Sequence, residues 1–143
     1  MGYRHGAHTV FEIHLHLVWT TKYRKAILRG EVGIGVRELI RQMCREVDVE
    51  IMKGHVSKDH VHLFVSIPPQ LTISRLVQKL KGKSSYKLLG EFPHLQKVFW
   101  GRHLWARGYF CCSSGRITDE MIRAYIEEQS HEDDIDFKVE GED

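Results

Sequence analysis

The stretch that decides the fold runs Gly54-His55-Val56-Ser57-Lys58-Asp59-His60-Val61-His62-Leu63-Phe64-Val65-Ser66-Ile67-Pro68-Pro69. Its apolar half predicts a short buried strand, which the two prolines end because proline cannot donate to a β ladder. Since residues i and i+2 of a strand share a face, His60 and His62 should project side by side. We expect Val61 and Phe64 on the opposite face. Two imidazoles on one face form half of a divalent-metal site, although the same spacing also suits two ordinary histidines at the mouth of a strand.

Segments on either side of this stretch predict the rest of the architecture. A short turn joins it to a preceding β-like segment, so the two should form an antiparallel hairpin. The expected order is strand 9–21, helix 31–48, strand 49–56, the strand from residue 60, helix 71–89, a loop-like segment 92–107, strand 108–113 and helix 119–130. This order predicts an α+β fold with a ferredoxin-like split βαβ core: a four-stranded antiparallel sheet with two helices on one face, plus a C-terminal helix.

A second His-x-His motif, His14-Leu15-His16, lies in the middle of the first predicted strand. In the expected topology the first and third strands are central neighbours, so these imidazoles should lie beside His60 and His62. No adjacent turn exposes them. We therefore interpret them as structural residues, or as supports for the metal ligands, rather than as primary ligands.

The net charge of +2 conceals an asymmetry along the chain. Residues 1–116 carry 19 basic and 8 acidic side chains, a net of +11, whereas residues 117–143 carry 2 basic and 11 acidic, a net of −9. A basic body suits a polyanionic partner such as nucleic acid, and the acidic end should lie away from it. The candidate phosphate contacts are Lys22, Arg24, Arg75, Lys79, Lys81 and Lys83. An ordinary solvated surface is the alternative for these cations.

Length and composition predict one domain, residues 1–130, followed by an acidic C-terminal tail, residues 131–143. No apolar run reaches the length of a membrane span, and the N-terminus has no apolar signal core. We therefore expect a cytoplasmic protein without membrane contact. The sequence contains no GxxxxGK[ST] loop, so no nucleotide cofactor is expected.

The last predicted helix carries a second candidate site. Tyr125 and Gln129 are four residues apart and therefore share one helix face. A tyrosine phenolate can act as a nucleophile, and the amide oxygen of a glutamine can complete a metal site. A half-buried packing tyrosine is the alternative.

Together these motifs resemble those of the HUH single-tyrosine transposases of the smallest insertion sequences, often called TnpA, and of their domesticated relatives that act on repeated palindromes. The resemblance covers nearly the whole chain, up to about residue 129. It rests on five stretches in order: His16–Arg24, Gly54–Phe64, Lys79–Ser84, Trp105–Phe110 and Tyr125–Gln129. It implies that His60-Val61-His62 is the HUH motif, that Tyr125 is the catalytic nucleophile, and that Gln129 joins the metal.

The resemblance further implies a homodimer that cleaves and rejoins single-stranded DNA at hairpin-marked ends. His60, His62 and Gln129 would hold Mg²⁺ or Mn²⁺. Tyr125 would form a 5′-phosphotyrosine and release a 3′-OH. Three alternatives stay open: a domesticated tyrosine nuclease acting on chromosomal palindromes, a non-catalytic module that binds single-stranded nucleic acid, and, more distantly, a metal hydrolase that uses water in place of tyrosine.

Overall fold

The computed structural model describes residues 3–6, 10–11, 13–99, 103–113, 121 and 124–125. Its elements are β1 (Arg4–His5), β2 (Val10–Phe11), β3 (His14–Thr20), the 3₁₀ turn η1 (Lys22–Arg24), α1 (Gly30–Glu46), β4 (Glu50–Val56), β5 (His60–Ser66), α2 (Ile73–Glu91), α3 (Pro93–Val98) and β6 (Phe110–Ser113). Residues 121, 124 and 125 are helical, within the helix predicted over 119–130. Gln129 and the predicted tail lie outside the described residues. None of the helices in these segments is long and apolar enough to cross a bilayer.

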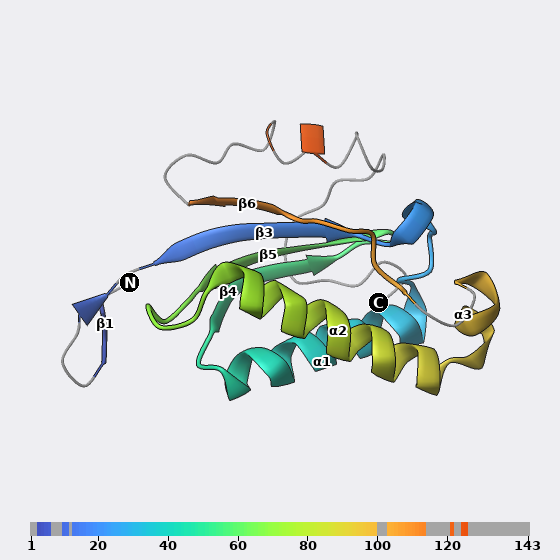
Figure 1. The fold of residues 1–143 in the computed structure, drawn as a ribbon, viewed down its shortest axis with the longest axis horizontal. Coiled ribbons are helices and arrows are strands. Elements are labelled where there is room, and N and C mark those ends of the chain that lie inside the picture. The colour runs from blue at the N-terminus through green and yellow to red at the C-terminus, as the bar shows by residue number, and fades with distance from the viewer. Residues whose placement is uncertain are drawn as a thin grey trace.

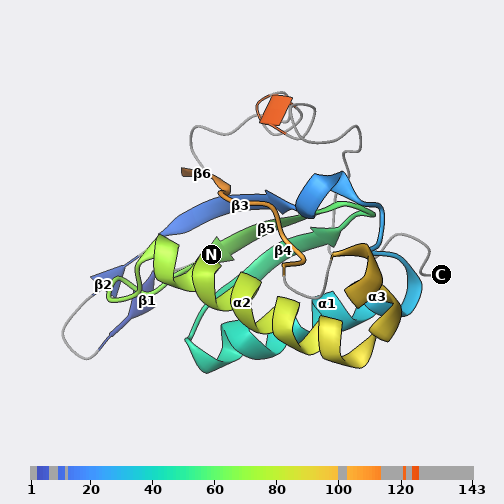
Figure 2. The same ribbon diagram turned by 45° about the vertical axis from the view of Figure 1, so that its right-hand side comes forward.

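Four strands form an antiparallel sheet in the order β4-β5-β3-β6, so β5 and β3 are central neighbours. α1 and α2 lie across one face of this sheet (Figure 1, Figure 2). The predicted α+β fold is therefore confirmed, including the central place of the strand that begins at His60. Its register against β3 sets Val18 opposite His62 and Thr20 opposite His60.

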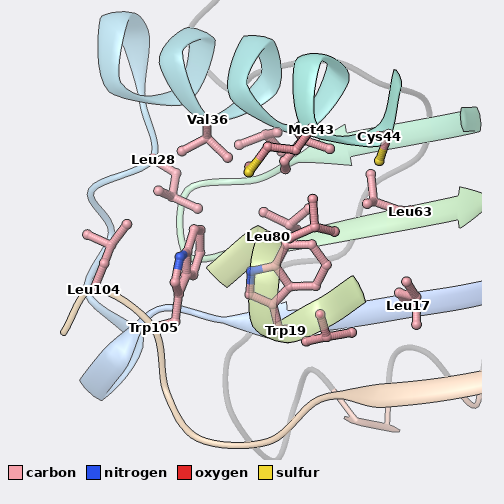
Figure 3. Packing of buried hydrophobic residues seen from close by; sticks show 14 of the residues in the cluster. Leu17, Trp19, Leu28, Val36, Met43, Cys44, Leu63, Leu80, Leu104 and Trp105 are labelled. Atoms are coloured by element: carbon pink, nitrogen blue, oxygen red, sulfur yellow. The ribbon is translucent and has the colours of Figure 1, made fainter. Parts of the chain in front are cut away.

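The main hydrophobic core fills the space between the two helices and the inward face of the sheet. Alternate residues of the two central strands supply it: Leu15, Leu17, Trp19, Val61, Leu63 and Val65. Figure 3 shows Trp19 and Trp105 in this core. Their ring centroids are 5.9 Å apart, and the rings pack edge to face. Because successive strand residues alternate between faces, the remaining residues of β3 and β5 point away from the helices.

The predicted strand 9–21 is divided between two sheets, because Val10–Phe11 form β2, which pairs with β1, and β3 begins at His14. Arg4 holds the β1–β2 hairpin to the domain. The Arg4 guanidinium donates to the backbone oxygens of Ser66, at 2.9 Å, and Asp48, at 2.7 Å. It also forms ion pairs of 3.1 Å with Asp48 and 3.3 Å with Glu50. Arg4 therefore joins the start of β4 to the end of β5.

Two predictions about helices are wrong in detail. The segment 92–107 is not uniformly loop-like, because α3 begins at Pro93, where proline suits the first helical turn, and buries Leu95 in the core. α2 runs to Glu91, two residues beyond the predicted end at residue 89. Thr72 caps α2, its hydroxyl accepting from the amide of Arg75 at 3.2 Å.

The expected orientation of Phe64 is also wrong. Phe64 is four residues from His60, so the two-residue period of a strand places both on the same face. It pairs with His16 across the ladder and stacks on that ring, with centroids 4.6 Å apart. Val61 does face the core, as predicted.

Candidate active site

The face of the sheet that points away from α1 and α2 carries five of the described histidines. We call it the histidine face, and its members follow from the cross-strand register, since directly opposed residues share a face. They are His60, His62 and Phe64 on β5; His14, His16, Val18 and Thr20 on β3; His55 on β4; and Phe110 and Cys112 on β6. The predicted neighbourhood of the two His-x-His motifs is therefore present.

Asp59 orients His60. Its carboxylate oxygen Oδ1 lies 3.0 Å from Nδ1 of His60, and the side chains are 5% and 1% exposed. A carboxylate beside Nδ1 keeps the proton on that nitrogen, so that Nε2 carries the lone pair. Nε2 of His60 is buried and has no hydrogen-bond partner among the described residues. The turn itself is fixed, because the Asp59 carbonyl accepts from the amide of Thr21 at 2.9 Å.

His62 is held from the neighbouring strand. Nδ1 of His16 lies 3.0 Å from Nε2 of His62, so one ring nitrogen donates to the other. His16 is in turn stacked on Phe64. Burial, followed by the nearby His16, His60 and His55, lowers the pKa of His62 to about 4. His62 is therefore neutral at pH 7, which is the form that ligates a metal.

These two histidines fit the half of a divalent-metal site that the sequence predicts. Nε2 of His60 is buried, has no hydrogen-bond partner in the described part of the chain and carries a lone pair that could bind a metal, and His62 is neutral. A metal at Nε2 of His62 would require His16 to release that nitrogen. No three His, Cys, Asp or Glu side chains in the described part of the chain are grouped closely enough to hold a metal. Gln129, the third ligand that the resemblance implies, is outside that part.

Tyr125 lies on the histidine face. It is helical and half-buried, and its ring centroid is 5.4 Å from that of Phe110. It packs against Val18 as well, and Val18 is the residue directly opposite His62. In Figure 1 the helical residues of this region, drawn in orange, lie on the side of the sheet away from α1 and α2. The structure thus brings a phenol to the face that carries the His-x-His pair.

The predicted phosphate contacts do not gather on that face. Lys79 and Lys83 on α2 pair with Glu46 of α1, at 3.5 and 3.8 Å. Lys81 donates from Nζ to the carbonyl oxygens of Ala106, at 2.7 Å, and Gly108, at 3.0 Å, and burial lowers its pKa. The other three are placed as follows: Arg75 is exposed near the start of α2, and Lys22 and Arg24 belong to η1.

One support of the site, Asp59, was not predicted from the sequence. Asp59 stands directly before the His-x-His motif, and this adjacency of a carboxylate to a candidate ligand is the signal that could have identified it. His16 was predicted beside His62, as a structural residue or a support for the metal ligands. Its contact with His62 depends on the exact strand register, because a pairing one residue out would turn His16 to the core.

Comparison with solved structures defines the class of protein. A crystal structure from Deinococcus radiodurans R1 assigned as a transposase matches with a TM-score of 0.81 and 33% sequence identity, covering 90% of this chain and 99% of the other. The fold is thus that of a transposase, an enzyme that cuts and rejoins DNA. The chain belongs to the family "Transposase IS200 like", whose family model matches residues 9–129.

Individual relatives agree with this assignment. The ISDra2 transposase TnpA of Deinococcus radiodurans is 35% identical over 120 residues, which cover 84% of this chain and 86% of that protein. The transposase for insertion sequence element IS200 of Salmonella typhimurium is 35% identical over 127 residues, covering 89% and 83%. The structure of a REP-associated tyrosine transposase bound to a REP hairpin shares the fold, with a TM-score of 0.55 and 14% identity over 87% of this chain and 72% of that one.

Proposed function

We propose that the chain cleaves and rejoins single-stranded DNA at hairpin-marked ends, with Tyr125 as the nucleophile. The observation that carries this proposal is the position of Tyr125 against Val18, on the face where Val18 opposes His62. A packing tyrosine would need no histidine ligands beside it. Membership of the IS200-like transposases supports the same chemistry.

The proposed reaction has two steps, cleavage and rejoining, and each step exchanges one phosphodiester for another. The phenol oxygen of Tyr125 attacks the scissile phosphorus and loses its proton, and the bond to the 3′ oxygen breaks. That oxygen takes up a proton, leaving a free 3′-OH and a 5′-phosphotyrosine. A second 3′-OH then attacks the phosphotyrosine and restores the phenol. The bond energy is retained throughout, so no nucleotide cofactor is needed.

The chain's own residues prepare the phosphate site. His60 and His62 would hold Mg²⁺ or Mn²⁺, with Gln129 as the further ligand. When bound, such a cation stabilises the negative charge that develops on the scissile phosphate. Asp59 keeps the lone pair of His60 directed toward the site, and the low pKa of His62 keeps it neutral.

The DNA partner is proposed to be a single strand with hairpins, contacted by the cations of η1 and α2. The relative bound to a REP hairpin supports this choice of partner, as does the net charge of +11 over residues 1–116. We further propose that the protein acts as a homodimer in the cytoplasm. Identity of 35% to transposases of insertion sequences favours an element's own enzyme over a domesticated nuclease.

A covalent-adduct assay tests the proposal. The protein is mixed with a pool of single-stranded hairpins, which includes the ends of its own element, and Mn²⁺. DNA attached to peptides is then identified by denaturing gel and mass spectrometry. We expect a metal-dependent adduct on Tyr125 that disappears in Tyr125→Phe and persists in Tyr3→Phe, a matched change on the N-terminal hairpin. Tight hairpin binding without an adduct would instead favour a binding module.

A further inference from the structure

A large groove lies on the helical side of the sheet, between α2, η1 and the segment 103–109 that leads to β6. Its volume is about 1390 Å³. This exceeds the roughly 300–1,000 Å³ of typical small-molecule clefts, so a chain-like ligand suits it better. None of its lining residues belongs to the histidine face, so it is a separate surface.

Three tyrosines from three different segments line the groove. Tyr23 comes from η1, Tyr86 from α2 and Tyr109 from the residues before β6. Tyr86 is 83% exposed and Tyr23 is 70% exposed, which is unusual for large aromatic side chains. Exposed rings offer stacking surfaces to unpaired bases, whereas bases within a duplex are already stacked.

The charge of the groove matches a polyanion. Its lining includes four lysines and arginines, Lys22, Lys81, Lys87 and Arg107, and one acid, Glu91. Lys22 holds its ammonium group 5.3 Å above the ring of Tyr23, so a cation and an aromatic ring are presented together. Cations beside exposed aromatics form the combination that single-strand-binding grooves use.

One wall of the groove is held in a strained conformation. Tyr23 and Arg24 have φ of +60° and +53°, a region that bulky residues rarely adopt. The surroundings hold the turn in place, because the amide of Lys22 donates to the Leu104 carbonyl at 2.8 Å and the Thr21 hydroxyl donates to the Lys25 carbonyl at 2.8 Å. Strain of this kind clusters at ligand-binding sites.

The opposite wall is fixed as well. Lys81 of α2 donates to the carbonyls of Ala106 and Gly108. Trp105 donates from its indole nitrogen to the Ser84 hydroxyl at 2.8 Å, and its backbone bridges to Thr21. The groove is therefore formed before any ligand arrives, which lowers the entropy cost of binding.

We propose that this groove binds an unpaired stretch of the DNA strand that is cut. The inference rests on the proposed function for the identity of the DNA, and on the groove's own residues for the mode of binding. Thr20, opposite His60, is followed directly by the turn that carries Tyr23. One strand of DNA can therefore pass from the groove, around this end of β3, to the histidine face.

The test measures binding of a fluorescent oligo(dT) of about 20 nucleotides, which has no hairpin, by anisotropy at fixed salt. Tyr86→Ala should weaken binding about tenfold, since loss of one stacked base has an effect of this order. Tyr86→Phe should bind like the parent protein because the ring remains. Tyr3→Ala is the matched control, since Tyr3 is 70% exposed, close to the 83% of Tyr86, but directly precedes β1, outside the groove lining. Alanine suits a helix, so Tyr86→Ala should fold.

A second measurement locates the DNA directly. Oligonucleotides carrying 5-iodouracil should cross-link under ultraviolet light to peptides that contain Tyr23 or Tyr86. If Tyr86→Ala kept its affinity and the cross-links fell only outside the groove, the proposal that the groove binds DNA would be overturned, even if the adduct on Tyr125 forms. Weakened affinity and groove cross-links in a protein that never forms the adduct would support the groove and reject the proposed cleavage.

Discussion

The carboxylate of Asp59 lies 3.0 Å from Nδ1 of His60, and both side chains are almost fully shielded from water. In this contact the carboxylate orients the His60 ring. It favours the tautomer in which Nε2 has a lone pair, so the fold orients the His60 ring for the metal that we propose.

Replacement of Asp59 by Asn should therefore weaken Mn²⁺ binding by about tenfold, the lower end of the range for partners of metal-bound histidines. The amide is a weaker acceptor and no longer favours one tautomer. The affinity is measured from the electron paramagnetic resonance signal of free Mn²⁺. Asp48→Asn is the control, because Asp48 is an exposed carboxylate at φ +60°, where Asn is well tolerated. Equal losses in both variants would contradict the role of Asp59.

The lowered pKa of His62 predicts a pH dependence of stability in metal-free protein. Its pKa falls from 6.5 to about 4 on folding, so between these values the unfolded chain binds more protons than the folded one. The free energy of unfolding therefore has its full value from His62 above pH 6.5. It falls by about 3 kcal/mol at most as the pH is lowered toward 4. Urea unfolding at several pH values, with EDTA present, measures the loss. Over this pH range the free energy of unfolding should fall less in His62→Gln than in the parent protein. If the two proteins gave parallel curves of unfolding free energy against pH, the lowered pKa of His62 would be contradicted.

If the cations of η1 and α2 contact DNA phosphates, they should contribute to the salt dependence of DNA binding. Loss of Lys22 or Arg75 should reduce the slope of log affinity against log salt by about 0.7 for single-stranded DNA, and should weaken all sequences alike. Lys97→Ala is the comparison, since Lys97 is an exposed lysine on α3 outside the groove lining. If the slope were the same in all three variants and in the parent protein, Lys22 and Arg75 would not contact the DNA backbone.

Lys81 should matter for stability more than its neighbours do. Its ammonium group satisfies two carbonyls of the segment before β6, whereas Lys79 makes one surface ion pair with Glu46. We expect Lys81→Met to reduce the free energy of unfolding by about 1–2 kcal/mol, and Lys79→Met by less than about 1 kcal/mol. Urea titrations compare the two variants. A larger loss in Lys79→Met would show that the carbonyl contacts contribute little.

The sequence predicted the fold well because alternation and turn spacing are local signals. The two-residue period around His60 and the helix spacing of residues 31–48 and 71–89 were sufficient to predict a sheet with β3 and β5 at its centre. The same period also places Phe64 beside the histidines. The helix at Pro93 depends on burial of Leu95 in a core that only the complete fold provides.

The site was harder to predict than the fold. His60 and His62 stand out as a motif, but the contact between His16 and His62 joins residues 46 positions apart and depends on one register. The groove combines Tyr23, Tyr86 and Tyr109, which no local pattern connects. Such convergence is a property of tertiary structure, and side-chain type alone does not reveal it.

The register between β3 and β5 also constrains how this protein can evolve. Leu17 and Trp19 face the core, while His16 and Val18 on the same strand face the candidate active site. A slip by one residue would exchange the two sets, removing the apolar core and the imidazole cluster in a single event. Insertions within these strands should therefore be eliminated by selection on folding before catalysis is affected. Descendants that have lost transposition but still fold should keep the strand lengths, which makes their outer residues available for new DNA-related roles.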